Sequence, residues 1–222
     1  MRRTGATLAG VGIAGALVFL VGVATERPEL CLATKPLPAL TLAAWVALRS
    51  RGPVGRLTAV GLVLSAVGDV LLEAGPFLPG LLAFLSAHVA YLAAFLSAER
   101  RPALGRALPF LAWGVLAFAL LRPGLGPMTL PFAVYVTVIC LMMWRAAARV
   151  GSAGTPALAA LLGLAGAVSF GASDTLIAFD RFSAPIPGAR WPIMILYWLG
   201  QWGLAASAVV GCGMLHEKVN PA

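Results

Sequence analysis

The chain consists of long apolar stretches separated by short segments that hold proline, glycine and arginine. A helix that crosses a bilayer needs about 20 mostly apolar residues. With proline, glycine and charge taken as boundaries, the pattern predicts eight such helices. They cover residues 5–24, 34–48, 56–72, 77–97, 106–121, 128–148, 155–179 and 191–215. We therefore expect an all-α fold, a polytopic membrane helix bundle of about eight transmembrane helices, with residues 1–222 forming a single transmembrane domain.

Composition supports a membrane environment. Hydrophobic residues make up 60% of the chain and charged residues 11%, and the mean hydropathy is +0.93. Soluble domains carry about 25% charged residues. A chain with so few polar side chains could not cover its surface in water, so lipid is the expected solvent. We expect an integral membrane protein of the bacterial inner membrane, with the lipid bilayer as its first partner.

Basic residues predict how the chain is oriented. The net charge of +8 would suggest nucleic acid in a soluble protein. Here the arginines lie in short loops, where they set topology and contact anionic headgroups, so we expect no nucleic acid partner. One side of the predicted bundle holds both termini and eleven basic residues, namely Arg2, Arg3, Arg49, Arg51, Arg56, Arg100, Arg101, Arg106, Arg145, Arg149 and Lys218. The other side holds five, namely Arg27, Lys35, Arg122, Arg181 and Arg190. Both termini are therefore predicted to be cytoplasmic. The first apolar stretch lacks a clean cleavage site and is read as a retained helix.

Two of the predicted helices resemble each other. Residues 65–71 read SAVGDVL and residues 170–176 read FGASDTL. Each stretch lies in the third helix of a four-helix half, so the two helices would point the same way. A parallel four-plus-four duplication would explain the likeness. Chance similarity between helices rich in small residues explains it about equally well.

A few ionisable side chains fall inside the predicted helices. At the bilayer centre such a group costs at least about 2.5–3.5 kcal/mol, so it usually has a partner or a function. The candidates are Lys35, Asp69, Glu73, His88 and Asp174. In the predicted topology, Lys35, Asp69, Asp174, Tyr197 and Gln201 lie in the outer half of the bundle, and His88 lies deeper. Similar depth on several helices predicts one shared cavity.

Each candidate also has a structural interpretation. Asp69 or Asp174 could pair with Lys35 and only hold helices together. Glu73, next to a glycine and a proline, is typical of a solvated charge at a loop edge. His88 could be a hydrogen-bonded core histidine, and Tyr197 an aromatic side chain at the membrane interface.

Several classes of site have no sequence signal. The three cysteines, Cys31, Cys140 and Cys212, have no metal-ligand spacing. No nucleotide-binding loop, metal motif or nucleophile elbow is present in the sequence. We therefore expect a function that needs neither a metal ion nor an organic cofactor.

The polar positions, taken in order, resemble those of YhhN-type lysoplasmalogenases. The likeness covers roughly residues 30–210. It rests on KP at residues 35–36, GDVLL at 68–72, SF and SD at 169–170 and 173–174, YWLGQ at 197–201, and on Phe77, Gly80, Phe84, His88 and Tyr91. The resemblance implies an eight-helix membrane hydrolase. It would cleave the vinyl ether bond of a lysoplasmalogen, a lysophospholipid, to a fatty aldehyde and a glycerophospho-headgroup product.

The same resemblance implies that Asp69 and Asp174 are the catalytic carboxylates. We assign the polar side chains around them to substrate binding, namely Lys35, Glu73, His88, Tyr91, Ser173, Tyr197 and Gln201. Paired carboxylates serve the related oxocarbenium chemistry of glycosidases, so the residue types suit the reaction. The alternative is a proton-coupled transporter or a lipid-binding membrane protein, which could also use intramembrane aspartates. The predicted polar groups gather on one side only, and this favours an enzyme.

Overall fold

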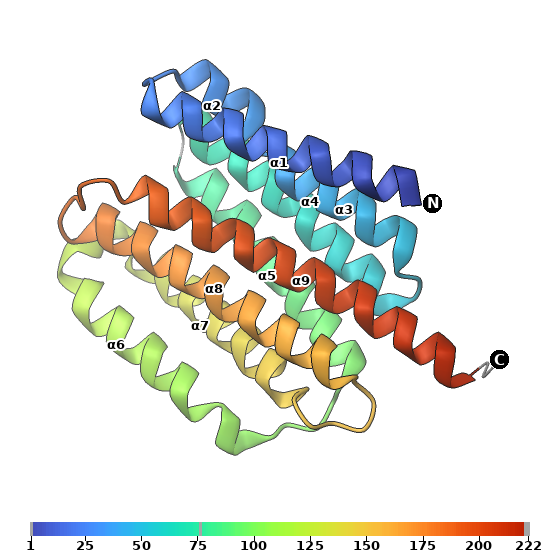
Figure 1. Ribbon diagram of the computed structural model, residues 1–222. Helices are drawn as coiled ribbons and strands as arrows, with labels where there is room; N and C mark the ends of the chain where they lie inside the picture. The colour runs from blue at the N-terminus through green and yellow to red at the C-terminus, as the bar shows by residue number, and fades with distance from the viewer. Residues whose placement is uncertain (1, 76, 220–222) are drawn as a thin grey trace.

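The computed structural model describes residues 2–75 and 77–219, and over these residues its regular structure is entirely helical (Figure 1). The prediction of an all-α bundle is therefore confirmed. The helices are α1 (Arg2–Ala24), α2 (Pro28–Thr34), α3 (Leu37–Arg49), α4 (Pro53–Ala74), α5 (Phe77–Ala98), α6 (Leu108–Leu125), α7 (Thr129–Ala148), α8 (Ala157–Phe182) and α9 (Arg190–Val219). Two short 3-10 turns, η1 (Leu104–Arg106) and η2 (Gly126–Met128), flank α6.

The second predicted helix is longer than expected and is divided in two. The short α2 precedes α3, and together they form one candidate membrane span, Pro28–Arg49. Pro36 and Pro38 stand where α3 begins, the part of a helix in which a missing N–H costs little. Lys35 therefore lies at the junction of the two helices, where its backbone N–H still donates to the carbonyl of Cys31.

Seven segments of the described chain are long and apolar enough to cross a membrane. One of them, Leu104–Ala148, contains both α6 and α7. These two helices pack side by side, because Gly126 has a φ of +49° and lets the chain reverse at η2 (Figure 1). The polytopic bundle is confirmed, while the count of eight spans and the four-plus-four repeat stay predictions.

Helices α8 and α9 run side by side at backbone contact (Figure 1). A Cβ atom on Gly166 would lie 2.7 Å from the backbone nitrogen of Leu204 and 2.8 Å from the carbonyl oxygen of Gly200. Small residues permit such close approach in membrane proteins. This contact sets the spacing of the two helices that carry Asp174 and Tyr197.

Gly166→Ala should lower the thermal unfolding temperature of the purified protein by about 5 °C or more. The added methyl group meets backbone atoms, which cannot turn aside. Gly10→Ala is the matched control, because nothing lies within 4 Å of a Cβ atom at Gly10. Equal unfolding temperatures for the two variants would show that α8 and α9 are not packed this closely.

Two arginines that the sequence assigned to topology and headgroup contact are instead buried. Arg145 donates hydrogen bonds to the backbone carbonyls of Glu99, Arg101 and Pro102, which follow the end of α5. Arg149 is buried as well. Carbonyls that follow a helix need donors once water is excluded, and a guanidinium supplies several. Arg145 therefore ties the end of α7 to the segment that follows α5.

Candidate active site

Figure 1 shows one end of the bundle at which α4 and α8 end and α5 and α9 begin. We call it the site end. Most of the predicted polar residues lie toward this end, whereas His88 and Tyr91 lie farther along, near the middle of α5. Asp69 is close to the end of α4, and Asp174 is about two turns before the end of α8. Tyr197 is about two turns into α9. The helix order thus brings side chains that are distant in sequence to the same end.

Asp69 is buried, with 1% of its surface exposed. The hydroxyl of Tyr197 donates a hydrogen bond to its Oδ2 atom over 2.6 Å. A buried carboxyl without a partner would cost several kcal/mol, and this contact lowers that cost. Tyr197 is itself buried, so its role as an interfacial aromatic is excluded.

Asp174 is held by two aromatic side chains from other helices. The Tyr135 hydroxyl donates to Asp174 Oδ2 over 2.7 Å, and His88 Nε2 lies 2.9 Å from the same oxygen. His88 Nε2 is also 3.0 Å from the Tyr135 oxygen. His88 is fully buried, and its Nδ1 atom has no partner among the described residues. His88 is therefore a hydrogen-bonded core histidine that also positions a candidate catalytic carboxylate.

Sequence reasoning missed Tyr135. The chain has only three tyrosines, and Tyr135 stands inside an apolar predicted helix. A phenol hydroxyl in such a place usually finds a polar partner, and this signal could have been used. The identity of that partner depends on the packing of α7 against α5 and α8, which hydropathy does not encode.

The two aspartates are held in a reciprocal way. Asp69 on α4 is bound by Tyr197 from α9, the helix that follows α8. Asp174 on α8 is bound by His88 from α5, the helix that follows α4. A parallel duplication would produce this exchange, although the repeat itself stays a prediction.

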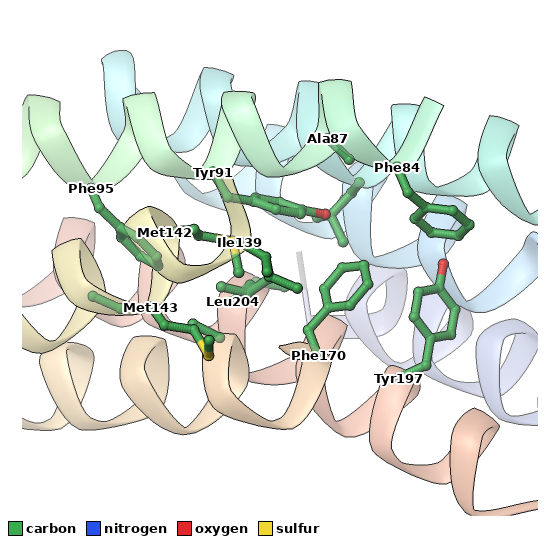
Figure 2. Packing of buried hydrophobic residues seen from close by; sticks show 14 of the residues in the cluster. Phe84, Ala87, Tyr91, Phe95, Ile139, Met142, Met143, Phe170, Tyr197 and Leu204 are labelled. Carbon is green, nitrogen blue, oxygen red and sulfur yellow. The ribbon is translucent and has the colours of Figure 1, made fainter. Parts of the chain in front are cut away.

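Aromatic rings fill the space between the two aspartate groups. The ring of Phe170 lies 5.3 Å from that of Tyr197, 4.6 Å from that of His88 and 6.0 Å from that of Phe84, all edge to face. Figure 2 shows Phe84, Phe170 and Tyr197 converging from α5, α8 and α9. Phe170 therefore packs against both Tyr197, which binds Asp69, and His88, which binds Asp174, and Phe84 packs beside it.

A small cavity of about 30 Å³ adjoins Asp174, whose side chain is 12% exposed. Its lining is Leu72, Phe77, Leu81, Phe84, Phe132, Tyr135, Asp174, Ile177, Ala178 and Phe182. The volume suits about one water molecule. Asp69 is not part of this lining, so this cavity does not bring the two aspartates together as the sequence suggested. Phe84, which lines the cavity, also packs against Tyr197 and stands on the side toward Asp69.

Glu73 is not the solvated charge that the sequence suggested, because its side chain is only 10% exposed. Lys35 Nζ lies 3.1 Å from one of its carboxylate oxygens, and Arg190 pairs with the other. Lys35 therefore pairs with Glu73 and with neither aspartate. Sequence reasoning missed Arg190 as a partner of Glu73. The available signal was its position at the start of α9, at the same end of the bundle as Glu73.

The remaining predicted residues bind other parts of the protein. The Tyr91 hydroxyl donates to Gln201 Oε1 over 2.8 Å and lies 3.2 Å from Ser65 Oγ. The Ser173 hydroxyl donates to the carbonyl of Ile193 over 2.9 Å, which ties α8 to α9. These contacts favour a structural role, and the assignment of Tyr91, Ser173 and Gln201 to substrate binding stays a prediction.

Comparison with known proteins settles the family. The YhhN family matches residues 30–208, a range that includes every predicted site residue. The chain belongs to the YhhN family. No solved structure matches the chain.

The relatives within this family carry a functional name. Human lysoplasmalogenase TMEM86B is 36% identical over 177 residues, which cover 79% of this chain and 74% of that protein. Human lysoplasmalogenase TMEM86A is 38% identical over 155 residues, or 68% of this chain and 64% of that protein. Mouse lysoplasmalogenase TMEM86B is 32% identical over 206 residues, or 91% of this chain and 86% of that protein.

Proposed function

We propose that this YhhN protein is a lysoplasmalogenase-like hydrolase that cleaves the vinyl ether bond of a lysoplasmalogen. The products are a fatty aldehyde and a glycerophospho-headgroup alcohol. The observation that carries the proposal is Asp174, held by Tyr135 and His88 beside a water-sized cavity within an apolar bundle. The relatives named lysoplasmalogenase support the same reaction.

The reaction consumes one water molecule. A proton adds to the alkene carbon farther from the ether oxygen, and the other alkene carbon becomes an oxocarbenium ion. Water adds to that carbon and loses a proton, which gives a hemiacetal. The hemiacetal C–O bond then breaks, releasing the aldehyde and the glycerol hydroxyl. The proton taken up by the alkene is matched by the proton lost from the added water, so the overall reaction consumes only the lipid and one water molecule.

Two carboxyl groups can supply what these steps need. A protonated carboxyl delivers the first proton, while an ionised carboxylate stabilises the oxocarbenium ion and accepts a proton from water. We propose that Asp69 and Asp174 share these tasks. In the structure Asp174 faces the cavity, and Phe84 stands on the side toward Asp69. Joint action therefore requires the Phe84 ring to turn aside when the substrate binds.

The fold also suits a single-chain lipid. Its tail can lie among apolar helices while its headgroup stays at the site end, near Lys35, Glu73 and Arg190. A transporter, the alternative, would need polar access from both ends of the bundle. At the opposite end, buried Arg145 is engaged by backbone carbonyls, and the two candidate catalytic carboxylates lie in the half of the bundle nearer the site end, so an enzyme is favoured.

The direct test incubates purified protein with a lysoplasmalogen in detergent micelles. We expect aldehyde and glycerophospho-headgroup product in equal amounts. Absence of aldehyde, together with solute uptake that occurs only in sealed vesicles, would support transport instead.

We propose the bacterial inner membrane as the location, with both termini in the cytoplasm. A reporter fused after Ala222, which lies outside the described residues, should be active only in its cytoplasmic form. The reason is that eleven of the sixteen basic residues fall on the predicted inner side. Activity of a periplasmic reporter at this position would reverse the topology and place the site end on the cytoplasmic side.

Lys35→Met should lower turnover of the lysoplasmalogen about tenfold, because it removes one of the two cations that hold Glu73 near Asp69. Lys35→Arg keeps the charge and should retain most of the activity. Steady-state rates of aldehyde release from the two variants provide the comparison. Equal rates for Lys35→Met and the unmodified protein would restrict Lys35 to a structural role.

A further inference from the structure

One face of α8 runs along the cavity beside Asp174. Asp174, Ile177, Ala178 and Phe182 all belong to the cavity lining. Their spacing of three or four residues places them on one side of the helix. Arg181, seven residues after Asp174, falls on the same side, about 10 Å farther along the helix axis. The cavity face of α8 therefore continues to an arginine at the site end.

Arg181 lies over the opposite wall of this cavity. Its guanidinium carbon is 4.2 Å from the centre of the Phe77 ring, a cation–π contact. Phe77 begins α5 and packs edge to face against Phe182, with ring centres 5.7 Å apart. Phe77 and Phe182 both line the cavity, and they stand at the start of α5 and the end of α8, at the site end. Arg181 thus lies beside the site-end part of the cavity, between α5 and α8, and we call this part the mouth.

The charge of Arg181 is not matched by a carboxylate. Among the described residues it forms no ion pair, and its side chain is exposed. The neighbouring Asp180 instead accepts a hydrogen bond from the backbone N–H of Ile186, over 2.7 Å. Of the other cations at this end, Lys35 and Arg190 both pair with Glu73. Arg181 therefore contacts the cavity lining through Phe77 and is available to an anionic ligand.

We propose that Arg181 binds the phosphate of a lysophospholipid at the mouth of the Asp174 cavity and so determines how deep the lipid enters. This inference rests on the proposed function for its substrate class. A guanidinium can donate two parallel hydrogen bonds to a phosphate, and the Phe77 ring holds its plane in place. Five bonds separate the phosphorus from the vinyl ether oxygen, a reach of about one helical turn. Side chains on a helix lean toward its N-terminus, so the Arg181 guanidinium can lie closer to Asp174 than the two Cα atoms do. The phosphate on Arg181 would therefore place the vinyl ether beside Asp174.

Binding of two uncleavable lipids tests this subsite. Hexadecyl-glycerophosphocholine carries the phosphate, whereas hexadecylglycerol has the same chain without it. The Kd of each lipid is measured for the detergent-solubilised protein and for Arg181→Gln, Arg181→Lys and Arg122→Gln. Arg122 is the matched control, because it is an exposed arginine in the last turn of α6, at the same end of the bundle.

We expect Arg181→Gln to raise the Kd of hexadecyl-glycerophosphocholine about tenfold or more and to leave that of hexadecylglycerol unchanged. Arg181→Lys should give an intermediate increase, because it keeps the charge and loses the planar pair of donors. Arg122→Gln should change neither value.

An unchanged Kd for the phospholipid, or an equal increase for both lipids, would overturn the subsite. The proposed function fails separately, if the unmodified protein releases no aldehyde from a lysoplasmalogen. The Kd values would still decide the role of Arg181 in that case, because they do not depend on turnover.

Discussion

Asp69→Asn and Asp174→Asn should each reduce aldehyde release from a lysoplasmalogen by a factor of about 10² to 10⁴. Asparagine keeps the size of the side chain and an oxygen that can accept from Tyr197 or Tyr135. It cannot deliver or accept the proton that vinyl ether hydrolysis requires. Because the two carboxyl groups would act on one substrate, the double variant should be little worse than either single variant.

Asp180→Asn provides the matched control on the same helix as Asp174. The Asp180 carboxylate accepts a hydrogen bond from a backbone N–H at the site end and lies outside the cavity lining. Turnover by the Asp180→Asn variant should therefore stay near that of the unmodified protein. Elution as a single monodisperse species in detergent verifies folding. If both single variants are well folded and hydrolyse the lipid at the unmodified rate, the catalytic pair is wrong. If only Asp174→Asn is slow, Asp69 has no catalytic role.

Tyr135→Phe should lower turnover about 10-fold to 100-fold while leaving the fold intact. The change removes the hydroxyl that donates to Asp174 and keeps the ring that packs against His88. A carboxylate that loses its orienting donor is held less well in the reacting geometry. Tyr197→Phe should act in the same way on Asp69. Rates of aldehyde release at saturating substrate measure both effects.

Tyr91→Phe gives the comparison, since its hydroxyl bonds to Gln201 and Ser65 and reaches neither aspartate. Its main effect should be a lower unfolding temperature, with a smaller loss of turnover than either of the other two variants. A loss of turnover as large as that of Tyr135→Phe would instead place Tyr91 in contact with the substrate.

Most of the helices could be predicted from hydropathy because a bilayer demands long apolar segments. The prediction failed around residues 28–36, where α2 begins earlier than expected. Charge was taken as a boundary, and Arg27 and Glu29 are charged, although an acidic residue in the first turn stabilises a helix. The same reasoning misjudged Arg145. Its position beside a loop suggested a free charge, whereas the folded chain surrounds it with carbonyls.

The depth of several site residues along their helices could be predicted from the sequence, whereas the contacts between their side chains could not. Helical position alone placed Asp69, Asp174 and Tyr197 toward one end, because each is a known number of turns from a helix end. The contact of Tyr135 with Asp174, and that of Arg190 with Glu73, join helices distant in sequence. Such contacts depend on which helices are neighbours, and the apolar pattern is nearly the same on all of them.

Hydrolysis of a lysoplasmalogen by the purified protein in deuterium oxide tests the central claim most directly. Protonation of the alkene carbon by a carboxyl group that exchanges with solvent must leave one deuterium on the carbon next to the aldehyde group. The account predicts that mass spectrometry finds this singly deuterated aldehyde, and that a matched aldehyde incubated without substrate turnover stays unlabelled. Release of an aldehyde without deuterium at that carbon, or no release at all, would contradict carboxylate-catalysed hydrolysis of the vinyl ether.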